Sequence, residues 1–183
     1  MRFDRKLARA TREQDMQAFL ECEPIMLLQH LGGGDGRWVI PRKRLGAEHV
    51  IDFIIGERDS AGWGWQAVEL KSPRARMFKK NGDPGAGLTH AIRQIQDWRA
   101  WLTKNIAYAQ AARDHHGLGL TDIRPDLSGL VLIGRSASVD RMTNSRRRQM
   151  EAELNIQIQP YDFLLDNARG RMAGAIALRK RRR

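Results

Sequence analysis

Three charged residues interrupt two short apolar stretches of this sequence. Asp52 stands inside the run 50–55 (VIDFII), and Glu69 and Lys71 stand at the end of the run 67–71 (AVELK). A buried strand normally avoids such groups, because burying an unpaired charge costs free energy. The charges within these apolar runs therefore indicate a site that combines two carboxylates with an ammonium group.

The elements that would position these groups are two β-strands of a hairpin. Both runs are rich in β-branched residues, and the segment 56–62 between them has the composition of a turn. Successive side chains of a strand point to opposite faces, so Glu69 and Lys71 share one face. If the strands pair as a hairpin, Asp52 can lie beside Glu69 within roughly 4–7 Å.

A structural salt bridge is the alternative interpretation of these charges. An ion pair at a sheet edge would account for Glu69 and Lys71. It accounts less well for Asp52, which stands in the middle of an apolar run. The spacing alone leaves the two interpretations open.

The pattern resembles the PD-(D/E)XK nuclease signature, in which an Asp is followed by Glu-x-Lys at the end of an apolar strand. The wider set of motifs is similar, in its order, to the nuclease domain of the Shedu family of anti-phage defence proteins. An ordered set is much more specific than the Asp and Glu-x-Lys pattern alone. The set consists of Glu13-x-x-x-Gln17-x-Phe19-Leu20-x-x-x-Pro24, Asp52-Phe53, Val68-Glu69-Leu70-Lys71-x-Pro73, Ala91-x-x-Gln94-x-x-x-Trp98, Ile133-Gly134-Arg135 and Tyr161-Asp162-x-Leu164-Leu165.

The resemblance implies a role for each residue of the site. Asp52 and Glu69 would bind a divalent metal, expected to be Mg²⁺ with Mn²⁺ as a substitute, because hard cations prefer oxygen ligands. Lys71 would orient or help deprotonate the attacking water and stabilise charge on the phosphorane. Glu13 would complete or tune the metal site, and Gln94 would position Lys71. In related nucleases a tyrosine follows the glutamine by four residues, and here Trp98 replaces it.

Glu13 and Gln94 also have plain structural interpretations. An acidic residue such as Glu13 in the first turn of a helix is favoured by the helix dipole. Gln94 can be an ordinary surface residue, although the apolar Ala91, Ile95 and Trp98 near it on a helix suggest partial burial.

The charge of the chain favours a polyanionic partner. The 183 residues carry a formal net charge of +11, which fits binding to DNA but is shared by ribosomal-type and membrane-surface proteins. A basic run follows the proposed site directly and could contact phosphates, although charge runs are most often solvated surface. This run consists of Arg74, Arg76, Lys79 and Lys80.

The composition excludes several classes of protein. No apolar run approaches the ~20 residues that cross a bilayer, and the polar N-terminus does not read as a secretion signal. The single Cys22 excludes an internal disulfide and a cysteine-cluster zinc site. We expect Cys22 to be a small buried thiol and the protein to be cytoplasmic.

The chain reads as one domain. We expect a flexible basic N-terminus over residues 1–10, a PD-(D/E)XK-like nuclease domain over 11–178 and a basic tail over 179–183. Thr11 and Gln14 have capping-box spacing and predict a helix start. The expected helices are 11–22, 25–28, 88–113, 139–154 and 161–178, and the expected strands are 37–40, 50–55, 67–71, 129–134 and 155–159.

This order of elements predicts an α/β fold with a mixed sheet flanked by helices, and the resemblance implies a restriction-endonuclease-like core. The implied function is metal-dependent hydrolysis of DNA in phage defence, and the family also suggests self-association. Two alternatives stay open. One is a non-catalytic nucleic-acid-binding module, and the other is a nuclease of the same superfamily that acts in DNA repair or on junctions. Tryptophans could also stack on bases, although Trp98 and Trp101 are expected to pack in the core.

Overall fold

A five-stranded sheet forms the centre of the molecule. The computed structural model describes residues 2–32 and 34–181, with side chains through 177. The strands lie side by side in sequence order, β1-β2-β3-β4-β5. They are β1 (Gly36–Leu45), β2 (His49–Asp59), β3 (Gly62–Leu70), β4 (Ser128–Leu132) and β5 (Ile156–Gln159).

The sheet is mixed because the chain returns in two different ways. Tight turns connect the first three strands, which pair antiparallel. Helical crossovers lead from β3 to β4 and from β4 to β5, and these pairs are parallel, as such connections require. The expected α/β class, a mixed sheet flanked by helices, is confirmed.

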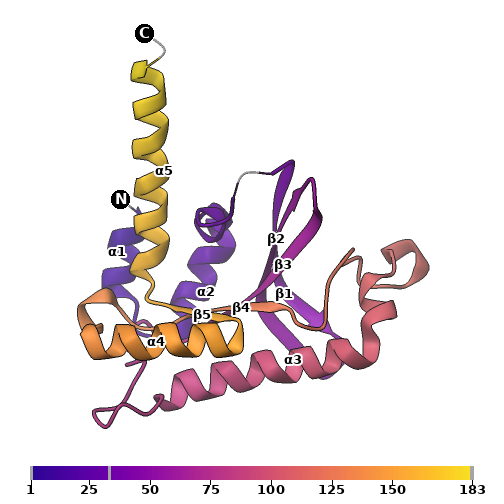
Figure 1. Cartoon of the computed structure of the whole chain (residues 1–183), viewed down its shortest axis with the longest axis horizontal. Coiled ribbons are helices and arrows are strands. Elements are labelled where there is room, and N and C mark those ends of the chain that lie inside the picture. The colour runs from indigo at the N-terminus through magenta and orange to yellow at the C-terminus, as the bar shows by residue number, and fades with distance from the viewer. Residues whose placement is uncertain (1, 33, 182–183) are drawn as a thin grey trace.

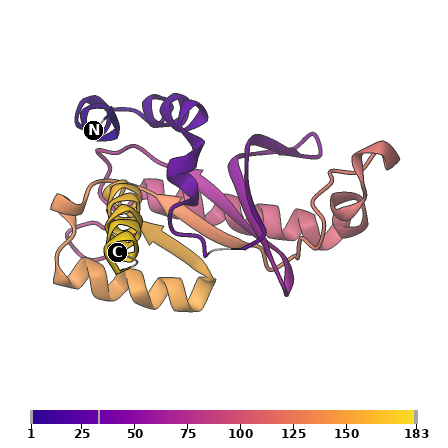
Figure 2. The ribbon, with the colours of Figure 1, turned by 90° about the horizontal axis from the view of Figure 1, so that it is seen from above.

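Helices cover both faces of the sheet (Figure 1). The long helix α3 lies along one face, and α1, α2 and the start of α5 lie on the other, while α4 runs beside the edge strand β5 (Figure 2). No helix within residues 2–32 and 34–181 has an apolar segment long enough to span a bilayer. The helices are α1 (Arg2–Arg9), α2 (Glu13–Cys22), α3 (Ala86–Gln110), α4 (Arg141–Leu154) and α5 (Asp162–Arg181), with short 3₁₀ segments at Pro24–Leu28, Arg113–His115 and Ser136–Ser138.

Strand alternation divides the buried side chains into two cores. In β2, Ile54 packs on the α3 side, whereas Phe53 and Ile55 pack on the side of α1 and α2. Val68 of β3 joins the second group. Ile51 belongs to the α3-side core together with Ile54, so the regular alternation of β2 is broken at Asp52. A hydrogen bond from the backbone N–H of Leu70 to its carboxylate places this side chain next to the end of β3.

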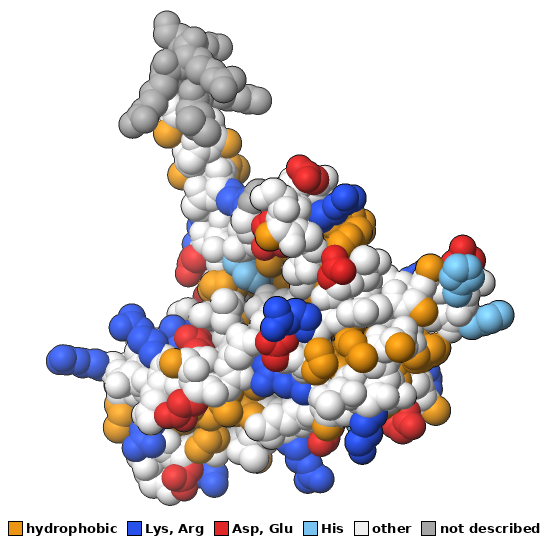
Figure 3. Space-filling model, turned by 45° about the vertical axis from the view of Figure 1, so that its right-hand side comes forward, with side chains coloured by type: hydrophobic (Ala, Val, Ile, Leu, Met, Phe, Trp, Pro, Cys, Tyr) orange, Lys and Arg blue, Asp and Glu red, His pale blue; other side chains and the backbone are white. Residues whose placement is uncertain are grey.

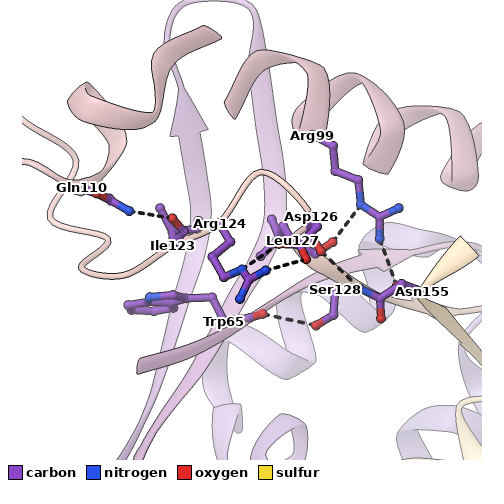
Figure 4. A network of polar contacts seen from close by, with 9 residues as sticks. All are labelled: Trp65, Arg99, Gln110, Ile123, Arg124, Asp126, Leu127, Ser128 and Asn155. Atoms are coloured by element: carbon purple, nitrogen blue, oxygen red, sulfur yellow. Dashed lines mark hydrogen bonds and ion pairs between the residues drawn. The ribbon is translucent and has the colours of Figure 1, made fainter. Parts of the chain in front are cut away.

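One arginine fixes α3 along the sheet (Figure 4). The Arg99 guanidinium donates to the backbone oxygens of Leu127 at 2.8 Å, Leu154 at 2.8 Å and Asn155 at 3.0 Å. Each accepting carbonyl precedes β4 or β5, so a single side chain ties α3 to both parallel strands. A guanidinium suits this task because it offers several donors in a rigid plane.

The N-terminus differs from the sequence-based expectation. Residues 2–9 form the helix α1, and the side chains of Phe3, Leu7 and Ala10 are buried in the core. Their spacing of three and four residues places them on one face of the helix. The Phe3 ring also meets the Phe19 ring edge to face, with centroids 5.5 Å apart. The expectation of a flexible segment is therefore wrong for residues 2–10.

Three local expectations are also corrected. The segment 56–62 mostly continues β2 and β3, and only Ser60 and Ala61 connect the strands. The helix α2 starts at Glu13, and the Asp15 carboxylate accepts from the backbone N–H groups of Thr11 and Arg12, so the Thr11–Gln14 capping box does not form. Cys22 is exposed at the end of α2, because the buried side of this helix carries Met16, Gln17 and Leu20.

The burial of Leu7 predicts that α1 contributes to stability. Leu7→Ala should lower the free energy of unfolding by about 2–5 kcal/mol, the usual cost of deleting a buried leucine side chain. Arg5→Ala on the exposed side of α1 is the control and should change it by less than about 0.5 kcal/mol. Urea titrations of both variants measure this difference. Equal, small losses would mean that α1 does not pack on the core.

Candidate active site

The β2–β3 hairpin brings the two predicted carboxylates together. Phe53 pairs with Val68 in an antiparallel register, and the next positions along this register are Asp52 and Glu69. The Asp52 carboxylate accepts a hydrogen bond from the backbone N–H of Leu70 at 2.9 Å. This bond fixes the Asp52 side chain across the hairpin, where the sequence predicted it.

Lys71 connects three elements at the end of β3. Its Nζ donates to Glu69 Oε1 at 2.5 Å and to Gln94 Oε1 of α3 at 3.0 Å. It also lies 3.8 Å from Glu13 Oε2 of α2. The Lys71 side chain is only 10% exposed and that of Glu69 only 2%, so this ion pair is largely shielded from water. All five residues predicted for the site therefore converge.

Burial raises the pKa values of all three carboxyls. For Glu69, burial and the neighbouring Asp52 charge raise the pKa from 4.5 to about 8, although the Lys71 ammonium opposes them. Burial also raises the pKa of Asp52, against the hydrogen bond from Leu70. The pKa of Glu13 is raised by burial more than Lys71 lowers it. Three carboxyls that resist ionisation at one place are typical of a functional site.

The backbone that carries Lys71 is held by other parts of the fold. The Lys71 N–H donates to Leu132 O of β4 at 2.8 Å, and Lys71 O accepts from the fully buried Tyr161 hydroxyl at 2.9 Å. Burial raises the pKa of Tyr161 well above its ordinary value, so the hydroxyl keeps its proton. Sequence reasoning assigned no role to Tyr161, although it belongs to the last of the ordered motifs.

The oxygen donors of the site suit a divalent cation. Glu69 Oε2 is buried and has no hydrogen-bond partner. Of the three carboxylates at the site, Asp52 and Glu69 lie across the hairpin from one another, whereas Glu13 belongs to α2. Within residues 2–32 and 34–181, no three acidic, histidine or cysteine side chains are grouped as a metal cage; Lys71 separates Glu69 from Glu13. The arrangement fits an ion held by two carboxylates and completed by water, as Mg²⁺ prefers.

The basic residues predicted to bind DNA are divided by the structure. Arg76, Lys79 and Lys80 line a common pocket. Arg74 is exposed on the same loop and does not line that pocket. The side chains of the predicted basic tail, residues 179–183, lie outside the described residues. On the face shown in Figure 3, lysines and arginines are scattered among carboxylates.

The tryptophans mostly contact protein groups. Trp98 of α3 is buried in the core as expected, and Trp101 packs at the border of the same core. Trp63 lies between Trp38 and Trp65, with ring centroids 4.4 and 5.6 Å away. Trp63 and Trp65 are neighbours on one face of β3, and Trp38 of β1 reaches them over Gly56 of β2, which pairs with both Trp38 and Trp65. These contacts give the three rings a structural role that requires no nucleic acid.

Comparison with known proteins identifies the family. The family model described as "Shedu protein SduA, C-terminal" matches residues 10–165. The chain belongs to the Shedu family. The matched segment contains Glu13, Asp52, Glu69, Lys71 and Gln94, and the recognition of the family from its ordered motifs is confirmed.

Other comparisons add little to this Shedu assignment. No curated protein matches the sequence. Among solved structures the chain is similar to one described as "Structure of EndoMS-dsDNA2 complex", with 16% identity and a TM-score of 0.33. The similarity covers 76% of this chain and 43% of that chain, so the chain spans less than half the length of that protein.

The raised pKa of Glu69 predicts how stability depends on pH. A carboxyl whose pKa is higher in the folded state binds a proton more tightly there, so its stabilising effect is complete below pH 4.5. The effect is lost as the pH rises through about 8. In EDTA, the free energy of unfolding should fall across this range, by at most about 1.4 kcal/mol per pH unit for one proton.

Urea titrations in EDTA at pH 5, 6, 7 and 8 measure this slope. Glu69→Gln should flatten it, because the variant has no carboxyl to titrate at this position. Glu48→Gln, at an exposed carboxylate, should leave the slope unchanged. If Glu69→Gln has the same slope as the parent protein, Glu69 does not titrate between pH 4.5 and 8.

Proposed function

We propose that this Shedu domain is a metal-dependent endonuclease that hydrolyses phosphodiester bonds of DNA in defence against phage. The observation that supports it most is the convergence of Asp52, Glu69, Lys71, Gln94 and Glu13 from four elements onto one cluster around the buried Glu69 and Lys71. A salt bridge alone would need only Glu69 and Lys71. The cluster stands at the end of β3 in the mixed sheet, and family membership supports the defence role.

Asp52 and Glu69 would hold the metal, Mg²⁺ or Mn²⁺ in its place, and the bound ion would acidify water and neutralise phosphate charge. The hydrogen bond from Leu70 keeps one Asp52 oxygen in place. Oε2 of Glu69 has no hydrogen-bond partner within the protein, so this oxygen would be free to bind the metal. The Asp52 carboxylate is therefore held by a backbone hydrogen bond and the Glu69 carboxylate by Lys71, although both would supply oxygen ligands.

Lys71 would orient the attacking water and stabilise the negative charge that develops on the phosphorus oxygens. An ammonium group has three donors, and in the structure Glu69 and Gln94 accept two of them. Glu13 Oε2 lies 3.8 Å away, beyond hydrogen-bond distance, so the third donor would serve a water or a phosphate oxygen. Gln94 acts as a positioning residue, and Glu13 tunes the charge around Lys71 from the exposed side.

Two other functions compete with this proposal. A non-catalytic DNA-binding module would bind through its basic residues, need no divalent metal and tolerate loss of Asp52. A repair or junction nuclease would use the same residues on branched DNA. Cleavage assays on plasmid, linear and branched DNA distinguish these alternatives, and self-association remains a separate expectation from the family.

We predict that three substitutions abolish cleavage and spare DNA binding. Asp52→Asn and Glu69→Gln remove the charges that attract a metal, while Lys71→Ala removes only the ammonium. Each should lower Mg²⁺-dependent cleavage by about 10²-fold or more, and EDTA should do the same to the parent protein. Affinity for DNA should change little, because phosphate contacts elsewhere provide most of it.

Calorimetric titration with Mg²⁺ separates the roles within this set. Asp52→Asn and Glu69→Gln should lose affinity for the ion, and Lys71→Ala should largely retain it. If the charges form only a structural salt bridge, a double-mutant cycle between Glu69 and Lys71 would show coupling in stability without any effect on cleavage. Full activity of a folded Lys71→Ala variant would refute the proposed mechanism.

Gln94 offers a second test with a matched control. Gln94→Ala removes the hydrogen bond that orients Lys71 and should lower kcat about tenfold or more, with less effect on KM, since positioning matters most in the transition state. Gln96→Ala changes an exposed glutamine two residues further along α3 and should leave kcat unchanged. Equal losses of kcat for both variants would show that Gln94 has no special role.

A further inference from the structure

A basic pocket lies between the loop after β3 and the start of α4. It has a volume of about 240 Å³, enough for a phosphate group with its water. Met77 and Phe78, which are 2% and 8% exposed, contribute apolar surface to it. The loop provides Arg76, Lys79 and Lys80, and α4 provides Arg146.

Backbone hydrogen bonds give the loop side of this pocket a fixed shape. Lys79 O accepts from Gly82 N–H at 2.9 Å, and Lys79 N–H donates to Asp83 O at 2.8 Å. Gly82 has a φ of 87°, which favours glycine. The absence of a side chain there also admits Arg146, because a Cβ at this position would stand 2.5 Å from the Arg146 guanidinium carbon. The tight turn and Arg146 therefore fit against each other.

The four cations of the pocket have no partners of their own. Among the described residues, no hydrogen bond or ion pair is formed by the side chains of Arg76, Lys79, Lys80 or Arg146. One carboxylate lines the same pocket, Asp140, and it accepts from Thr143 N–H at 2.7 Å as the cap of α4. Four cations and one carboxylate leave a net charge of +3 on the pocket lining.

Three half-buried arginines of the chain have partners within the protein. Arg99 contacts three carbonyls, Arg135 forms a two-bond pair with Asp162, and Arg147 contacts Gln159 and Glu151. Arg146 is adjacent to Arg147 in sequence but points to the pocket instead. Like charges that gather without partners repel one another, and an anion bound among them would relieve the repulsion.

The pocket is built from the segments that follow β3 and β4, beyond the end of the sheet where Lys71 also lies. Parallel strands β3 and β4 end together, and Gly134 N–H donates to Ser72 O at 3.2 Å just beyond those ends. Arg76 follows Lys71 by five residues, so their Cα atoms lie within roughly 18 Å of each other. Successive phosphates of one DNA strand are spaced about 3.4 Å apart along the axis of the duplex. A strand at the active site can therefore reach the pocket within a few nucleotides.

We propose that this pocket binds a backbone phosphate of the DNA a few nucleotides from the bond that is cut, with Arg146 as its contact from α4. The inference rests on the proposed nuclease function and adds to it a second, fixed point of contact. A guanidinium can bond two phosphate oxygens at once, and the turn lysines supply further charge. Two contacts on one strand set its direction and register relative to Lys71.

The test compares two arginines of the same helix. In a Glu69→Gln background, which keeps the DNA intact, duplex DNA affinity is measured at several salt concentrations. Arg146→Ala should weaken binding about tenfold at low salt and reduce the slope of log K against log salt by about 0.9. Arg148→Ala removes the same charge two residues further along and should change the slope much less. Both side chains are exposed, so unfolding midpoints should stay the same.

Equal effects of Arg146→Ala and Arg148→Ala on DNA affinity and on the salt slope would overturn the proposal, because net charge alone would then explain binding. Inorganic phosphate at constant ionic strength forms another arm. It should compete with DNA only weakly, and less in Arg146→Ala. Tight binding of inorganic phosphate, with DNA affinity unaffected by Arg146→Ala, would assign the pocket to a free phosphate ligand and refute the proposal.

Cleavage assays with Glu69 intact keep the two proposals separate. A protein that cuts DNA but shows equal effects at positions 146 and 148 would retain the nuclease function and lose the pocket. A protein that binds DNA through Arg146 but cuts none of the DNA substrates would lose the nuclease function and retain the phosphate contact.

Discussion

The ion pair of Lys71 with Glu69 is the constraint on which the surrounding structure depends. Taking two such charges out of water costs several kcal/mol per ion, and their attraction offsets this only when further hydrogen bonds are made. Here the partners come from elements far apart in sequence. The helix α3 supplies Gln94, α2 supplies Glu13, and Tyr161 holds the backbone of Lys71 from the other core.

Positioning of these partners depends on anchors away from the site. Gln94 precedes Arg99 by five residues of the same helix, about 7.5 Å along its axis. Since Arg99 is bonded to the segments that lead into β4 and β5, α3 cannot slide along the sheet without breaking those bonds. The amide of Gln94 is thus held at a fixed distance from an anchor on the same sheet that carries Lys71.

The parts of this structure that sequence could predict are those that local patterns determine. The strands containing Asp52 and Glu69, and the continuous apolar strand β4, follow from residue type and alternation. The helix α1 was missed because its many basic residues suggested a solvated tail, although Phe3 and Leu7 have helical spacing. Cys22 was misplaced because a thiol alone does not reveal which side of α2 is buried.

Contacts between distant segments were out of reach of such patterns. The spacing of the charges alone does not decide whether Asp52 belongs to a functional site or to a salt bridge. Glu13 and Gln94 are predicted as site residues only because of the resemblance to the Shedu family. Arg146 looked like any member of a basic run, because nothing in the sequence shows that Gly82 leaves room for its guanidinium. Gly82 and Arg146 are 64 residues apart in the sequence. They come into contact only because α4 packs beside β5 in the folded chain (Figure 2).

The same electrostatics that make the cluster costly also make it suited to chemistry. Three carboxyls with raised pKa values face a single ammonium group, so the negative charge that they could carry exceeds what Lys71 can neutralise. A well-packed structural salt bridge would match its charges one to one and would leave no buried oxygen without a partner. The unpartnered Oε2 of Glu69 fits the proposed role of this carboxylate as a ligand for an ion, which would supply the partner that the protein itself does not.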